Sequence, residues 1–212
     1  MNKYFDESAL LKMLDWAYEK ALSAALPGID SSVSLANKYL EKSGTLEEQV
    51  DALIKWQNTK AATIGFFTGL GGITALPVTI PSNLASVLYL QVRMTAAIAI
   101  MGGYDLKDEK VKTMIFTCLC GNLAMDVLKS YGIQLSTKLT QQVLLSLESK
   151  VIEKIQRTIA GKILGKVGEL GFFNTTKAIP FVGGLIGGAF DAMTTRTVGK
   201  VAKMVFITKP KS

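Results

Sequence analysis

The stretch AATIGFFTGLGGITALPVTIPSNLASVLYLQV, residues 61–92, decides the fold of this chain, because 32 consecutive positions carry no charged side chain. One arginine, Arg93, follows it, and the sequence then stays uncharged until Asp105. A segment this long and apolar must be buried inside the protein or placed in a membrane. The stretch therefore predicts the centre of the molecule, and we expect the other segments to pack around it.

Glycines and prolines divide the stretch into the two helical legs of a hairpin. The legs cover about residues 61–76 and 84–101, and Pro77 and Pro81 mark the turn between them. At 1.5 Å per residue the legs are about 24 and 27 Å long, slightly short of a hydrocarbon core of about 30 Å. A central arginine also costs about 2.5 to 3.5 kcal/mol on insertion into lipid. We favour a hairpin buried in protein, and a re-entrant hairpin in lipid is the alternative.

Apolar periodicity elsewhere predicts an all-α protein, a single-domain helical bundle around this glycine-rich hydrophobic hairpin. Thr45 and Glu48 match a capping box at the start of the helix that leads into the stretch. We expect an N-terminal helical segment, residues 1–58, and a helical core, residues 59–207, that together form one domain. The remaining helices are expected over about residues 7–25, 31–40, 105–128, 135–170 and from 174 onward.

The basic charge is concentrated in the C-terminal part of the chain. Residues 1–128 hold 11 basic and 13 acidic groups, whereas residues 129–212 hold 13 basic and 4 acidic groups. Within the helix predicted over 135–170, Lys150, Lys154 and Arg157 lie on the side opposite the apolar residues. Such a basic amphipathic helix suits the surface of an anionic membrane, or it is an ordinary packed helix with a solvated face.

The residue types present exclude several kinds of chemistry. The chain has no histidine and only two cysteines, which removes a histidine-dependent triad and disfavours a zinc site. The GLGG sequence at residues 69–72 follows a predicted helix and lacks the lysine of a phosphate-binding loop. We therefore expect no catalysis, no cofactor, no metal and no nucleic-acid partner.

Two solitary charges form the candidate binding site. Arg93 and Asp191 are each the sole charge in a long apolar segment, and a buried pair of opposite charges is the simplest way to accommodate both. Alternatively, Arg93 receives an anionic group such as a lipid phosphate. The uncharged hydrogen-bonding neighbours expected for that group are Gln91, Thr95, Thr194 and Thr195. Gly183 with Gly187, and Gly184 with Gly188, leave one flank of the Asp191 helix bare for a close helix contact, expected with the 61–76 leg.

With these residues in view, the chain resembles the EcsC family of bacterial proteins. The similar parts are GFFTGLGG at 65–72 with the prolines that follow it, LQVRMTAAIAIMGGYD at 90–105, and IPFVGGLIGGAFDAMTT at 179–195. The family takes its name from a gene beside a bacterial ABC-transporter operon. The resemblance implies a helical protein that is membrane-associated or has a hydrophobic core, and it supplies no catalytic residues.

These observations favour a protein peripheral to the cytoplasmic face of the cell membrane, which binds anionic lipid or a membrane-protein partner. The N-terminal residues carry acidic groups where an export signal needs an apolar core, so we expect a cytoplasmic location. The first alternative is a soluble helical adaptor whose hairpin is wholly internal. The second is a lipid-directed hydrolase that uses Asp105 or Asp191.

Overall fold

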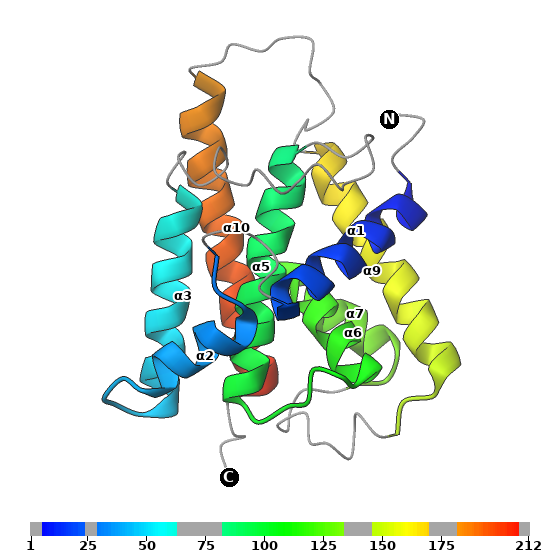
Figure 1. Cartoon of the computed structure of the whole chain (residues 1–212). Coiled ribbons are helices and arrows are strands. Elements are labelled where there is room, and N and C mark those ends of the chain that lie inside the picture. The colour runs from blue at the N-terminus through cyan, green and yellow to red at the C-terminus, as the bar shows by residue number, and fades with distance from the viewer. Residues whose placement is uncertain (1–5, 24–28, 63–81, 134–145, 170–181, 208–212) are drawn as a thin grey trace.

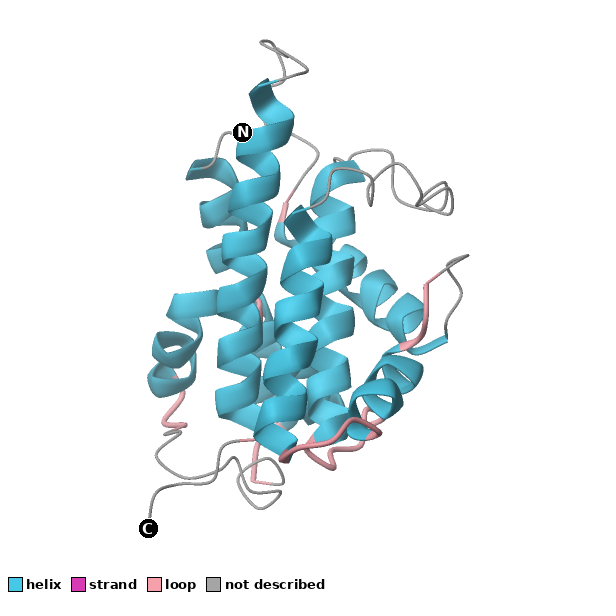
Figure 2. Ribbon diagram, turned by 90° about the vertical axis from the view of Figure 1, so that its left-hand side faces the viewer, coloured by secondary structure: helices cyan, strands magenta, loops and turns pink. Residues whose placement is uncertain are grey.

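The computed structural model describes residues 6–23, 29–62, 82–133, 146–169 and 182–207. Every regular element in these ranges is a helix, which confirms the all-α prediction (Figures 1 and 2). In chain order the elements are α1 (Glu7–Ser23), α2 (Ser32–Leu40), α3 (Leu46–Ala62), α5 (Ser82–Met101), α6 (Glu109–Cys118), the 3-10 turn η2 (Gly121–Leu123), α7 (Ala124–Ser130), α9 (Ser149–Glu169) and α10 (Val182–Phe206).

Helix α5 lies at the centre of the bundle, in contact with α1, α2, α3, α6 and α10 (Figure 1). Among the described helices, α5 is the one long and apolar enough to cross a membrane, and 94% of its Leu84–Met101 segment is buried inside the protein. The returning leg of the predicted hairpin is therefore a core helix. Most of the other predicted leg lies outside the described residues.

The helix ends follow the sequence signals closely. The Thr45 N–H donates to the Glu48 carboxylate at 2.7 Å, and the Glu48 N–H donates to Thr45 Oγ1 at 3.3 Å. The predicted capping box is thus confirmed, and the bond from the Thr45 backbone lowers the pKa of Glu48. At the end of α5, Gly103 adopts a positive φ of 82°, which lets the chain leave the helix at low cost.

One predicted helix, over about 105–128, is wrong because the structure breaks it into α6, η2 and α7. The Leu119 and Cys120 N–H groups bond to carbonyls three residues back, and Gly121 follows with a φ of 58°. The Lys166 ammonium of α9 donates to the carbonyl of Cys120, so a long-range contact satisfies the turn. Apolar spacing continues through the break, which is why periodicity alone does not reveal it.

The helix predicted over about 135–170 is also wrong at its start. Residues 146–148 are not helical, and α9 begins only at Ser149. The Val151 and Ile152 N–H groups both bond to the Glu148 carbonyl at this first turn. Leu147 packs against the core although it is not in a helix. Its spacing from the other apolar residues therefore looks helical in the sequence. Residues 134–145 lie outside the described ranges.

Helix α10 runs antiparallel to α3 and parallel to α5 (Figure 1). The Lys203 ammonium lies 2.7 Å from the Asp51 carboxylate and 3.7 Å from that of Glu47, and Gly199 lies against Ile54. The glycines at 183–188 lie in the first turns of α10. Their predicted contact with the glycines of the 61–76 leg falls outside the described residues.

The helices of the 1–58 segment and those that follow it share one hydrophobic core. Helices α1 and α2 pack directly on α5, and α9 lies at the outer edge of the bundle against α1, α6 and α7 (Figure 1). Two features of this arrangement are candidates for a functional site. One is the group of buried polar side chains on the central α5, and the other is the exposed outer face of α9.

Candidate functional site

Arg93 is a fully buried cation on the central helix. Its side chain is 1% exposed, and its Nε donates to the backbone carbonyl of Asp30 at 2.6 Å. Its Nη1 is also buried and has no hydrogen-bond partner. Among the described residues, no carboxylate lies within ion-pair distance of the guanidinium. The charge of Arg93 is therefore held in the described part of the protein by a single neutral carbonyl.

Burial shifts the pKa values of Arg93 and of the tyrosines near it. Loss of hydration lowers the pKa of Arg93 from its ordinary value, and the nearby Tyr89, Asp30 and Tyr39 partly offset that effect. Burial raises the pKa of Tyr89, and the positive charge of Arg93 opposes the rise. The tyrosine hydroxyls near Arg93 therefore stay protonated at neutral pH.

Gln91 lies on the opposite side of α5, because residues two apart on a helix point about 200° apart. Its amide Nε2 lies 3.4 Å from the Oγ1 atoms of both Thr194 and Thr195 on α10. Thr95, one turn further along the same side, has a buried hydroxyl without a partner. These residues form a polar seam between α5 and α10.

The structure brings Gln91, Thr194 and Thr195 together, but it directs Arg93 toward the start of α2 and not toward them. Asp191 lies within α10, and its side chain is outside the described part of the protein. The Arg93–Asp191 ion pair stays a prediction.

Sequence reasoning missed the residues that surround Arg93. Tyr89 lies one turn before it on α5, and the Tyr89 ring contacts the Trp16 ring of α1 with centroids 6.2 Å apart. The spacing of Tyr89 and Arg93, four residues on one helix, was a usable signal for their common face. Nothing in the sequence pairs α5 with Trp16 or with the carbonyl of Asp30.

The second candidate surface is the outer face of α9. Lys150, Lys154 and Arg157 are exposed, as the sequence predicts. The opposite face packs into the core, through Ile155, Ile159, Ile163 and Val167. The Arg157 guanidinium lies 2.7 Å from the carboxylate of Glu153 one turn away, so its charge is partly balanced. Lys150 and Lys154 are the cations of this face that make no ion pair among the described residues, and we call the three positions the α9 basic face.

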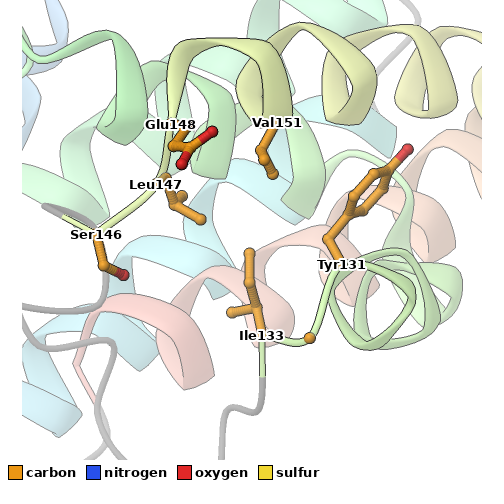
Figure 3. Close-up of a pocket in the computed structure, with 7 residues that line it drawn as sticks. Tyr131, Ile133, Ser146, Leu147, Glu148 and Val151 are labelled. Atoms are coloured by element: carbon orange, nitrogen blue, oxygen red, sulfur yellow. The ribbon is translucent and has the colours of Figure 1, made fainter.

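A hollow of about 450 Å³ lies between the end of α7 and the first turn of α9 (Figure 3). Its lining residues are Tyr131, Gly132, Ile133, Ser146, Leu147, Glu148 and Val151. The Tyr131 hydroxyl is within hydrogen-bond distance of Thr158 Oγ1 and of the Lys154 carbonyl. The hollow therefore lies beside the α9 basic face, at the points where residues 134–145 leave and rejoin the described chain.

Groups that support catalysis are scarce in the described residues. Burial raises the pKa of Cys118 and, to about 11, that of Cys120, so both thiols are protonated and enclosed. Asp105 is exposed and accepts the Lys107 N–H at 2.9 Å, which is a local turn contact. The described residues contain no group of three or more acidic, cysteine or histidine side chains placed to hold a metal ion.

In comparison with known proteins, the chain matches the model of the EcsC protein family over residues 8–208. The chain belongs to the EcsC protein family. No curated protein and no solved structure matches it. The match spans both the N-terminal segment and the helical core of this EcsC protein, so its two glycine-rich blocks and Arg93 all lie within the family region.

Proposed function

We propose that this EcsC-family protein is a non-enzymatic, peripheral membrane protein that attaches to an anionic lipid surface through the α9 basic face. The observation that carries the proposal is the orientation of α9. Its apolar residues pack into the core, and Lys150 and Lys154 face outward. A cation near an anionic membrane surface contributes about 1 kcal/mol of attraction. The surplus of basic groups after residue 128 acts in the same direction.

Attachment from one side, in place of insertion, is supported by the burial of α5. Among the described helices, α5 is the one apolar enough for the hydrocarbon region, and its side chains already pack against other helices. Helix α9 lies at the outer edge of the bundle (Figure 1), and the three residues of the α9 basic face are exposed. On the cytoplasmic side of a cell membrane, that surface is anionic. A membrane-protein partner, such as a transporter subunit, would be reached from the same side.

The test is flotation with lipid vesicles of neutral phosphatidylcholine, with and without phosphatidylglycerol. Binding should require the anionic lipid. It should weaken as salt is raised from 50 to 500 mM, because the Debye length then shortens from about 14 to about 4 Å. The double variant Lys150→Gln/Lys154→Gln should bind roughly 30-fold more weakly, because it removes about 2 kcal/mol of attraction. We leave Arg157 in place because of its ion pair with Glu153.

The matched control is Lys38→Gln/Lys55→Gln, which removes the same charge from exposed positions on α2 and α3. Its vesicle affinity should stay within a few-fold of the wild type. Equal losses in the two double variants would mean that net charge, and not the α9 basic face, controls attachment. Absence of vesicle binding at every salt concentration would favour the soluble adaptor instead.

A further inference from the structure

Three buried hydrogen-bond donors without partners lie where α1 and α2 pack on α5. They are the indole Nε1 of Trp16, the hydroxyl of Tyr89 and the Nη1 of Arg93. Trp16 and Tyr89 are in ring contact at 6.2 Å, and Tyr89 and Arg93 share one side of α5. The three side chains therefore form a connected group, which we call the donor cluster.

The donor cluster offers hydrogen-bond donors and few acceptors. An indole N–H and a guanidinium only donate hydrogen bonds, and a tyrosine hydroxyl readily donates one. The positive charge of Arg93 meets one backbone carbonyl and, among the described residues, no carboxylate at ion-pair distance. Buried polar groups in proteins are almost always paired, so three donors without partners, one of them on a cation, call for an acceptor that carries negative charge.

We propose that the donor cluster is a binding site for a phosphate group, either free or on a lipid headgroup, with Arg93 supplying the charge and Tyr89 and Trp16 supplying the further donors. The Nε of Arg93 donates to the backbone carbonyl of Asp30, which is an exposed residue two positions before α2. The guanidinium thus contacts a backbone segment that reaches the surface, and in this proposal the ligand enters by displacement of the Ile29–Ser31 segment. This site is separate from the α9 basic face and uses none of its residues.

The geometry also explains why the neighbours expected from the sequence do not serve this role. The Gln91 amide donates to the hydroxyls of Thr194 and Thr195 on the far side of α5. Trp16 and Tyr89 instead present donors on the side where the guanidinium lies. The proposed ligand therefore contacts α1 and α5 and lies beneath the start of α2.

The experiment measures thermal unfolding and calorimetric binding of the full chain with inorganic phosphate, against sodium chloride of equal ionic strength. A parallel arm uses dihexanoyl phosphatidic acid below its micelle concentration. Saturable stabilisation by inorganic phosphate assigns a free phosphate ligand, and stabilisation by the lipid alone assigns a headgroup. Stabilisation by neither probe beyond that of chloride would overturn the proposal.

Tyr89→Phe is the decisive variant, because it removes only a hydroxyl that has no partner in the free protein. Its unfolding temperature without ligand should equal or exceed that of the wild type, whereas its affinity for the active probe should fall at least tenfold. Trp16→Phe should weaken the same probe to a similar extent, and Arg93→Met should abolish binding. Should Arg93→Met fail to fold, the first two variants still decide the outcome.

Tyr18→Phe is the matched control. The Tyr18 hydroxyl donates to the Leu106 carbonyl at 2.6 Å, so its loss should lower the unfolding temperature and leave the affinity for the probe unchanged. An unchanged affinity in Tyr89→Phe, or equal losses in Tyr89→Phe and Tyr18→Phe, would show that the donor cluster does not hold the ligand. The vesicle result for Lys150 and Lys154 is independent of these measurements, so the two proposals fail separately.

Discussion

Gly102→Ala should lower the free energy of unfolding by about 3 kcal/mol, at the upper end of the usual range for overpacking. A Cβ at Gly102 would lie 2.5 Å from the backbone carbonyl oxygen of Phe206, at the end of α10. A carbonyl cannot rotate aside as a side chain can. The Phe206 ring is fully buried and lies edge-on to the Tyr104 ring with centroids 5.1 Å apart, so any shift of this backbone disturbs the core.

Gly165→Ala is the control for this prediction. Gly165 lies inside α9, and a Cβ there would meet no atom within 4 Å. The substitution should raise the free energy of unfolding by about 0.5 to 1 kcal/mol, because alanine favours a helix over glycine. Urea denaturation of both variants gives the comparison. A Gly102→Ala protein as stable as the wild type would mean that α10 does not end against α5 in solution.

The second large effect is expected where α10 crosses α3. A Cβ at Gly199 would lie 2.8 and 2.9 Å from two carbon atoms of the Ile54 side chain. Gly199→Ala should therefore cost about 2 kcal/mol through overpacking. Ile54→Ala should cost about 3 kcal/mol through the cavity that it leaves.

The double variant Gly199→Ala/Ile54→Ala distinguishes contact from independent damage. The new methyl group occupies space that Ile54 vacates, so the double variant should be more stable than the sum of the single losses by about 1 to 2 kcal/mol. Urea midpoints and m-values of the four proteins measure this coupling. Additive losses would argue that the two helices do not touch at these residues.

The sequence predicts most strongly those features that depend on one residue and its near neighbours. The capping box of Thr45 and Glu48 and the end of α5 at Gly103 need only local chemistry, and both occur in the structure. The interior position of α5 follows from its apolar composition, with Arg93 as its one charged residue, since so many apolar side chains must avoid water. For the same reason the exposed Lys150, Lys154 and Arg157 could be assigned to the outer side of α9 from periodicity.

Features that depend on a distant partner could not be predicted in this way. The turn after α6 is held by Lys166 of α9, and the apolar pattern passes through it without interruption. The sequence predicts a close helix contact at a glycine of α10, and the structure has such a contact at Gly199, which lies against Ile54. The contact predicted between the glycines at 183–188 and the 61–76 leg involves residues outside the described ranges. Helical spacing predicts the direction of Arg93 from α5, but not that Trp16 and the carbonyl of Asp30 lie there.

Because Cys118 and Cys120 are buried, the rate at which their thiols react can report how often the bundle opens. Both side chains are buried, and their raised pKa values keep the reactive thiolate scarce even when a reagent is near. An alkylating reagent can therefore modify them only when α6 and the turn after it separate transiently from their neighbours. The labelling rate in the native protein consequently reports how often this part of the core comes apart, without any engineered probe.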